Sequence, residues 1–250
     1  MDKSIEKIPS QIRRDILRMV HAVQSGHPGG SLGCTEFFVA LYFKILNHDK
    51  ESFNMNGQNE DIFFLSNGHI SPVFYSVLAR AGYFSIDELS TFRKLNSRLQ
   101  GHPTTHEGLP GVRIASGSLG QGLSVALGAA EAKKLSNDNN LIFSLHGDGE
   151  LQEGQIWEAA LYAGSKNIDN IIATIDANGQ QIDGSTNDVM PMGDIGSKFI
   201  SFGWEVLKID NGNNLSEVIE GLNTAINLSR KGKPVCIIMQ TEMGAGVDFM

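Results

Sequence analysis

The pattern that most constrains the fold is a series of short apolar segments that alternate with helical segments and end in glycine-containing turns. Apolar segments predicted as buried strands lie at 61–65, 141–145, 171–175, 205–209 and 235–239. Short strands without polar alternation, separated by helices, are typical of a parallel sheet that helices cover on both faces. The sequence therefore predicts the α/β class.

Helices are predicted where apolar residues recur every three to four positions. The expected helices lie at about 5–24, 37–45, 118–134, 153–163, 196–202 and 215–229. Ser85 and Glu88 have the spacing of a capping box that opens one more helix. The glycine-rich stretch 26–33 is expected to be a loop. No repeat, low-complexity tract or linker interrupts the chain, so a single domain is predicted over residues 1–250.

Composition and charge exclude several classes of partner. The chain has 20 Lys and Arg against 28 Asp and Glu, a net charge of −8, which argues against binding to nucleic acid or to an anionic membrane surface. No apolar run approaches the ~20 residues of a membrane helix, and the first residues form no signal-type core. Cys34 and Cys236 stand in apolar contexts without ligand-like spacing, as expected of buried thiols in a cytoplasmic protein.

Two turns carry the strongest functional signal. Asp148 and Asn178 each follow a predicted strand, so one strand–helix–strand unit brings both side chains to the same edge of the sheet. Carboxylate and amide oxygens, with a backbone carbonyl beyond Asn178, suit Mg²⁺, which keeps open positions for phosphate oxygens. Gly147 and Gly149 allow a close approach of the backbone to an anion. Because neither turn contains Lys or Arg, a divalent cation has to lie between Asp148 and a diphosphate.

Three histidines stand in glycine-containing loops, and two glutamates open a helix. One loop histidine alone is usually structural, but His27, His69 and His102 together can supply protons and hydrogen bonds to hydroxyl groups near neutral pH. A zinc site is the competing interpretation, disfavoured because no cysteines or clustered carboxylates accompany them. Glu153 and Glu158 begin the helix after the Gly-Asp-Gly turn, where the helix dipole favours acids for structural reasons alone. No role is assigned to the other histidines, His21, His48, His106 and His146.

Taken together, these motifs resemble the N-terminal half of the transketolases, the thiamine-diphosphate-dependent enzymes of two-carbon ketol transfer. The similarity spans nearly the whole chain in the family's order. The matching segments are 25–33, 65–69, 99–103, 117–123, 147–154 and 176–184.

The resemblance implies a cofactor and a metal ion for this chain. Asp148, Asn178 and the backbone carbonyl of Gln180 would hold Mg²⁺, or Ca²⁺ or Mn²⁺ in its place. Thiamine diphosphate would be bound by His69, Gly117, Ser118, Leu119, Gly149, Glu150 and Asn178.

The resemblance also implies catalytic residues. His27 and His102 would face the hydroxyl groups of the sugar, with His27 a candidate for proton transfer. Glu153 and Glu158 would join a glutamate network that links two active sites across a dimer interface, which replaces the structural interpretation given above.

A transketolase active site is shared between two domains, and this sequence stops before the second. In the family the pyrimidine-binding domain supplies the glutamate that activates the cofactor and the basic residues for sugar phosphate, and a further histidine follows the segment that ends here. We therefore expect a split transketolase in which this chain is the diphosphate-binding subunit. A C-terminal subunit would carry the pyrimidine-binding domain and the catalytic glutamate, in a heterotetramer. The substrates would be sugars or sugar phosphates, with a nucleotide-linked sugar also open as acceptor.

Two other interpretations remain open. A 1-deoxyxylulose-5-phosphate synthase or the first component of a 2-oxo acid dehydrogenase shares the Gly-Asp-Gly and Asn pattern, although 117–122 and 151–154 favour transketolase. A non-catalytic cofactor-binding protein that serves assembly or regulation belongs to a different class, and the three loop histidines argue against it.

Overall fold

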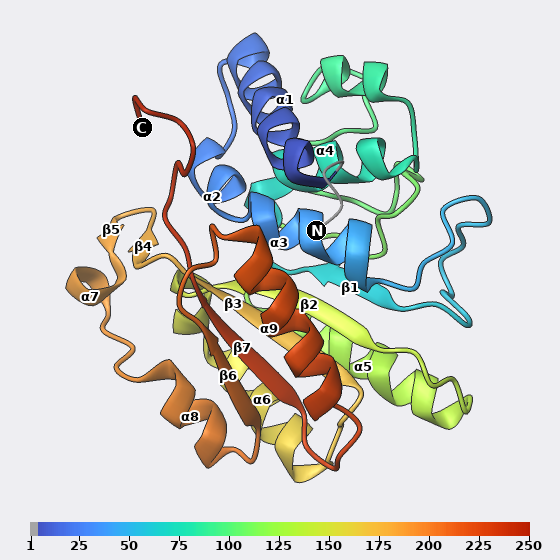
Figure 1. Cartoon of the computed structure of the whole chain (residues 1–250), viewed down its shortest axis with the longest axis vertical. Helices are drawn as coiled ribbons and strands as arrows, with labels where there is room; N and C mark the ends of the chain where they lie inside the picture. Colours follow the sequence, from blue (N-terminus) through green and yellow to red (C-terminus); the bar gives the residue numbers. More distant parts are fainter. Residues whose placement is uncertain (1–4) are drawn as a thin grey trace.

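A central parallel sheet lies between two layers of helices (Figure 1). The structure is a computed structural model that describes residues 5–250, so the first four residues of the predicted domain lie outside the described residues. The five strands of the sheet are β1 Ile62–Leu65, β2 Ile142–Gly147, β3 Ile171–Ala177, β6 Glu205–Ile209 and β7 Val235–Gln240. They pair in the order β1-β2-β3-β7-β6, all parallel. The predicted α/β class and the five predicted strands are confirmed.

The helices divide between the two faces of the sheet. One layer contains α1 Ile8–Val23, α2 Pro28–Gly33, α3 Thr35–Ala40, α4 Ser71–Ala81 and α9 Leu215–Leu228. The other layer contains α5 Gly122–Leu135, α6 Gly154–Ser165 and α8 Ile195–Ser201. Figure 1 shows α9 in front of β6 and β7, with α5 and α6 behind the sheet.

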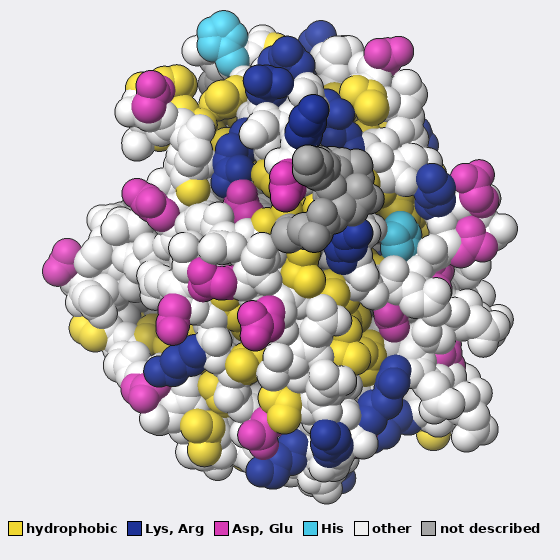
Figure 2. Space-filling model, viewed as in Figure 1, with side chains coloured by type: hydrophobic (Ala, Val, Ile, Leu, Met, Phe, Trp, Pro, Cys, Tyr) yellow, Lys and Arg dark blue, Asp and Glu magenta, His cyan; other side chains and the backbone are white. Residues whose placement is uncertain are grey.

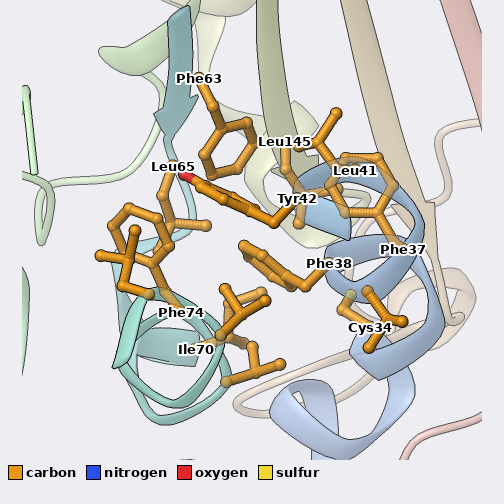
Figure 3. Close-up of a cluster of buried hydrophobic side chains, with 14 of the residues drawn as sticks. Cys34, Phe37, Phe38, Leu41, Tyr42, Phe63, Leu65, Ile70, Phe74 and Leu145 are labelled. Carbon is orange, nitrogen blue, oxygen red and sulfur yellow. The ribbon is translucent and has the colours of Figure 1, made fainter. Parts of the chain in front are cut away.

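Side chains of each strand alternate between the two layers, because successive strand residues point to opposite faces. In β1, Phe63 and Leu65 join the core beneath α3 and α4, whereas Ile62 and Phe64 join the core beneath α5. Figure 3 shows the first of these cores, in which the rings of Phe38 and Phe63 meet edge to face with centroids 5.5 Å apart. Both faces of the sheet are therefore covered by tightly packed apolar side chains.

Two helical predictions at the N-terminal side are wrong. Residues Pro28–Gly33 form α2 and not a loop, because Pro28 at the first helical turn needs no hydrogen-bond partner for its nitrogen and has the φ of a helix. Ser85 does cap the next segment, since its hydroxyl accepts from the N–H group of Asp87 at 3.3 Å, but that segment is a 3₁₀ helix. The carboxylate of Glu88 binds Arg98 at 2.8 Å instead of completing a capping box.

Helix α5 begins at Gly122 and not at Ser118. The N–H group of Gly120 donates to the Glu150 carboxylate and that of Gly122 donates to the Ser66 hydroxyl, at 2.8 and 3.1 Å. Because side chains bind these two N–H groups, the residues before Gly122 form a turn at the edge of the sheet instead of the first turn of the helix.

Several elements have no counterpart among the predictions. Helix α4 is buried along nearly its whole length, so its sequence lacks the alternation of apolar and polar residues that marks a surface helix. Beyond β3, the two short strands β4 Gln180–Gln181 and β5 Gly184–Ser185 form an antiparallel hairpin, followed by the single turn α7 Thr186–Val189. The hairpin and α7 are too short to be revealed by a periodic pattern of apolar residues.

The surface and the cysteines agree with the composition. Acidic and basic side chains are interspersed over the face seen in Figure 2. Cys34 and Cys236 are both buried free thiols, as predicted. Within residues 5–250 no helix has the length and apolar character needed to cross a membrane.

The aromatic core beneath α3 sets the first testable prediction. Phe38 is fully buried against Phe37, Phe63 and Phe74, so Phe38→Ala is expected to lower the free energy of unfolding by about 3–5 kcal/mol. Urea unfolding followed by circular dichroism measures the change. Leu95→Ala is the control, because Leu95 is 92% exposed and its truncation should change stability by less than about 0.5 kcal/mol. Equal effects of the two substitutions would contradict the described packing.

Candidate functional site

The carboxyl ends of β2 and β3 lie side by side and carry the two predicted turns. In the parallel register Gly147 is opposite Asp176. The N–H group of Asp148 donates to the backbone carbonyl of Asp176 at 3.1 Å. The carboxylate of Asp148 accepts from the N–H groups of Gly149 at 2.8 Å and Gly179 at 2.6 Å. The two turns therefore lie side by side, as the sequence predicts, and the side chain of Asp148 bridges them.

Asn178 is held in one orientation by its neighbours. Its side-chain nitrogen donates to the Asp176 carboxylate at 2.8 Å, and its side-chain oxygen accepts from the N–H group of Gln180 at 2.9 Å. Asp176 is itself buried and also accepts a hydrogen bond from the hydroxyl of Thr241, at the end of β7. Asp176 thus orients the amide of Asn178, a role that the sequence prediction missed.

Burial changes the acid–base properties of the two carboxylates. It raises the pKa of Asp148 to about 6, with the hydrogen bond from Gly179 opposing the shift and the charge of Asp176 adding to it. Burial likewise raises the pKa of Asp176. Among residues 5–250 neither carboxylate has a Lys or Arg ion-pair partner. Two neighbouring acids without a cationic side chain form an environment that favours a bound cation.

The oxygen atoms around Asp148 fit a hard divalent cation. An added Cβ on Gly149 would lie 3.6 Å from the backbone oxygen of Gln180 and 2.8 Å from Cβ of Gln181. Only glycine therefore leaves room where the two turns meet, and the carbonyl of Gln180 lies beside the Gly-Asp-Gly turn. A carboxylate, an amide oxygen and a carbonyl are ligands that Mg²⁺ and Ca²⁺ prefer, whereas no group of three His, Cys, Asp or Glu side chains within residues 5–250 is placed to hold a metal.

The three predicted histidines come together at the same edge of the sheet. The rings of His27 and His69 meet edge to face, with centroids 5.3 Å apart. His102 lies against Gly117, where an added Cβ would come 3.2 Å from the imidazole ring. Gly117 and Ser118 are exposed and Leu119 is half-buried, so the backbone of this turn is open to a ligand beside the histidines.

The environment keeps these imidazoles neutral. Burial, with a smaller contribution from the charge of His27, lowers the pKa of His69 to about 4. Burial and the guanidinium of Arg93 lower the pKa of both His27 and His102. Near pH 7 each imidazole therefore offers one hydrogen-bond donor and one acceptor.

Arg93 was missed by the sequence analysis. Its backbone is in the left-handed region, with a φ of 56°, a conformation that is uncommon for a residue other than glycine. Its guanidinium donates to the hydroxyl of Ser25 at 2.9 Å and lies against Gly101. Arg93 thus connects the loop before His27 with the loop before His102. A lone arginine outside any motif gives no sequence signal for such a position.

Two further loops approach this edge. An added Cβ on Gly68 would clash with the backbone oxygen of Ser116, so the turn after β1 touches the segment before Gly117. The side-chain oxygens of Asn67 and Ser116 are buried and have no hydrogen-bond partner among the described residues. Buried polar atoms without a partner are rare, and here both belong to the segments that meet beside Gly68.

The remaining predicted site residues lie after Asp148. Glu150 is buried, and both of its carboxylate oxygens accept hydrogen bonds from within the protein. Burial opposes its ionisation, but His146 and the hydrogen bonds from Ser66 and Gly120 outweigh burial and lower its pKa. Glu158 is exposed on α6, and Glu153 is exposed at the position before α6, where its side chain makes no capping hydrogen bond.

Comparison with known proteins identifies the class of this fold and site. The family described as "Transketolase, thiamine diphosphate binding domain" matches residues 5–249. The structure superposes on the transketolase of Leishmania mexicana with a TM-score of 0.89 and 31% identity, over 97% of this chain and 37% of that one. The chain thus spans little more than a third of that transketolase.

Two curated relatives of similar length are named as transketolase subunits. The 6-deoxy-6-sulfo-D-fructose transketolase subunit of Clostridium sp. strain MSTE9 is 38% identical over 95% of this chain and 84% of its own length. An apulose-4-phosphate transketolase subunit of Actinobacillus succinogenes is 38% identical over 98% of this chain and 87% of its own length. The chain belongs to the transketolase family and comprises its thiamine-diphosphate-binding domain.

The half-buried position of His69 gives a pH prediction. Because the folded state holds the pKa of His69 near 4, below the ordinary value of 6.5, the unfolded chain binds the proton first as the pH falls. Stability is therefore lost as the pH is lowered from about 6.5 towards 4. A nuclear magnetic resonance titration should find His69 neutral at pH 6 and titrating near 4. A midpoint near 6.5 would show that the imidazole is solvated.

Proposed function

We propose that this chain is the diphosphate-binding subunit of a split thiamine-diphosphate-dependent transketolase. Together with a second subunit it transfers a two-carbon ketol unit from a ketose to an aldose. The observation that carries the proposal is the bridge that Asp148 makes between the turns after β2 and β3. This bridge supports the proposal of a hard oxygen site at the sheet edge where the three histidines also lie. The subunit names of relatives that align over most of their length support the division into two chains.

Asp148, Asn178 and the carbonyl of Gln180 are proposed to hold the metal ion. Mg²⁺ is the preferred occupant, with Ca²⁺ or Mn²⁺ as substitutes, because the set consists of hard oxygens. The negative charge of Asp148 then faces the metal ion and not the diphosphate. The metal ion also supplies the positive charge that these turns, which contain no Lys or Arg, do not offer the diphosphate.

The cofactor is proposed to lie between the turn at 117–119 and the ends of the strands. His69 is suited to donate a hydrogen bond to a diphosphate oxygen, and Gly149 and Asn178 are proposed to lie beside the diphosphate. The exposed backbone of Gly117, Ser118 and Leu119 is the part of the site open to the remainder of thiamine diphosphate.

His27 and His102 are proposed to face the sugar. When bound, thiamine diphosphate supplies the nucleophilic carbon that takes up the two-carbon unit. A neutral imidazole has one nitrogen that accepts a proton and another that donates a hydrogen bond. His27 is therefore suited to move a proton at a sugar hydroxyl, and His102 to orient the sugar chain beside it. The substrates are proposed to be sugars or sugar phosphates.

The proposed partner is a C-terminal subunit with the pyrimidine-binding domain and the glutamate that activates the cofactor. Glu153 and Glu158 are exposed at the start of α6, where they are available to the proposed glutamate network across a subunit interface. Exposed Leu161 and Tyr162 on the same helix add apolar area to that face. A cytoplasmic heterotetramer with two copies of each subunit is the proposed assembly.

The metal site is tested by Asp148→Ala in the assembled complex. Loss of the carboxylate that bridges the two turns is expected to weaken Mg²⁺-dependent thiamine diphosphate binding by about 100-fold or more. Isothermal calorimetry measures the affinity. His27→Ala is the matched control: cofactor affinity should stay the same while turnover falls by roughly 10²–10⁴-fold. An unchanged affinity for Asp148→Ala would reject the site.

The division of the enzyme is tested by a ketol-transfer assay with thiamine diphosphate and Mg²⁺. The chain is assayed alone and with the product of the adjacent gene, against free, phosphorylated and nucleotide-linked aldoses. Transfer is expected only in the mixture, because the activating glutamate is proposed to belong to the second subunit. Full activity of this chain alone would contradict the need for a second subunit.

A further inference from the structure

Glu150 lies where three segments that are far apart in the sequence meet. One carboxylate oxygen accepts from the Ser66 hydroxyl and from the N–H group of Gly120, the latter at 2.8 Å. The other accepts from the N–H group of Gly147 at 3.1 Å. Ser66 follows β1, Gly120 precedes α5 and Gly147 ends β2, so one side chain connects three loops at the edge that carries the proposed cofactor site.

Ser66 extends the same connection. Its hydroxyl donates to Glu150 and accepts from the N–H group of Gly122 at 3.1 Å. Gly122 is the first residue of α5. Gly120 has a φ of 86°, and an added Cβ on Gly122 would clash with the Ser66 hydroxyl oxygen. The turn before α5 therefore packs closely against Glu150 and Ser66, and glycine is needed at both Gly120 and Gly122.

The geometry leaves Glu150 little capacity to bind the cofactor itself. The side chain is only 2% exposed, and each of its oxygens already accepts from donors within the protein. A carboxylate beside a diphosphate would also repel it. The exposed residues Gly117 and Ser118 lie three and two positions before Gly120, the glycine that donates to Glu150.

We propose that Glu150 is a positioning residue, which together with Ser66 fixes the 117–122 turn against the ends of β1 and β2 and so forms one wall of the cofactor site in advance. This inference rests on the proposed function for the identity of the ligand. It assigns to Glu150 a role other than the direct cofactor contact implied by family resemblance.

Substitutions separate the two roles. Glu150→Gln replaces an acceptor oxygen by an amide nitrogen, which faces N–H groups and leaves at least one of them unpaired. Ser66→Ala keeps the carboxylate and removes the hydroxyl that connects it with Gly122. The control is Glu60→Gln, because Glu60 is also buried but binds Arg113 and the N–H group of Asp49, before β1 and away from this edge.

Hydrogen exchange on the full chain without ligand tests the positioning directly. Glu150→Gln and Ser66→Ala should each speed exchange of the Gly120 and Gly122 amides by at least about tenfold, while Glu60→Gln leaves both unchanged. Unchanged exchange in both site variants would overturn the proposal. If Glu150→Gln fails to fold, Ser66→Ala carries the test alone.

Cofactor binding by the assembled complex completes the experiment. Glu150→Gln is expected to raise the Kd for thiamine diphosphate by at least about tenfold, while kcat at saturating cofactor stays within about twofold of the unsubstituted enzyme. A lower kcat with unchanged Kd would mean that Glu150 acts on the reacting groups, and would overturn the proposal. A complex of the unsubstituted chains that binds no thiamine diphosphate would overturn the proposed function and the cofactor role of Glu150, whereas the exchange result would still decide whether Glu150 fixes the turn.

Discussion

The parallel pairing of β2 with β3 is the interaction on which the rest of the site depends. Asp148 and Asn178 are 30 positions apart in the sequence, and the register that sets Gly147 opposite Asp176 brings the turns that follow both strands together. The same register places two carboxylates close to each other. At an effective dielectric constant of 20, two like charges 4 Å apart repel by about 4 kcal/mol. The fold therefore brings together two carboxylates whose mutual repulsion a bound cation would reduce.

Glycines decide how closely the loops of the site approach one another. Gly68 lies against the backbone of Ser116, and Gly149 against Gln181, at distances that leave no room for a Cβ. The first contact joins the turn after β1 to the segment before α5, and the second joins the turns after β2 and β3. Two apolar layers keep the strands themselves in place, so the shape of the site follows from rigid strand ends and close glycine contacts.

Much of this arrangement can be predicted from the sequence, because parallel strands and their turns have local signals. The five strands, the adjacency of Asp148 and Asn178, and the grouping of the loop histidines all follow from apolar segments that end in glycine-containing motifs. The connections made by Asp176, Arg93 and Glu150 do not follow, because each depends on which distant backbone groups the folded chain brings within reach. Helix α4 was missed for a related reason: burial on all sides removes the periodicity that identifies a helix.

The neutral state of the three histidines has a consequence for selectivity. Burial and Arg93 hold the pKa values of His27 and His102 below their ordinary range, and burial does the same for His69. Uncharged imidazoles recognise hydroxyl groups by direction and distance, but they exert little long-range attraction on an anion. These histidines are therefore suited to read the stereochemistry of a polyol chain and are poorly suited to distinguish a phosphorylated or sulfonated terminus from a neutral one. Discrimination by charge has to come from cationic groups outside this cluster.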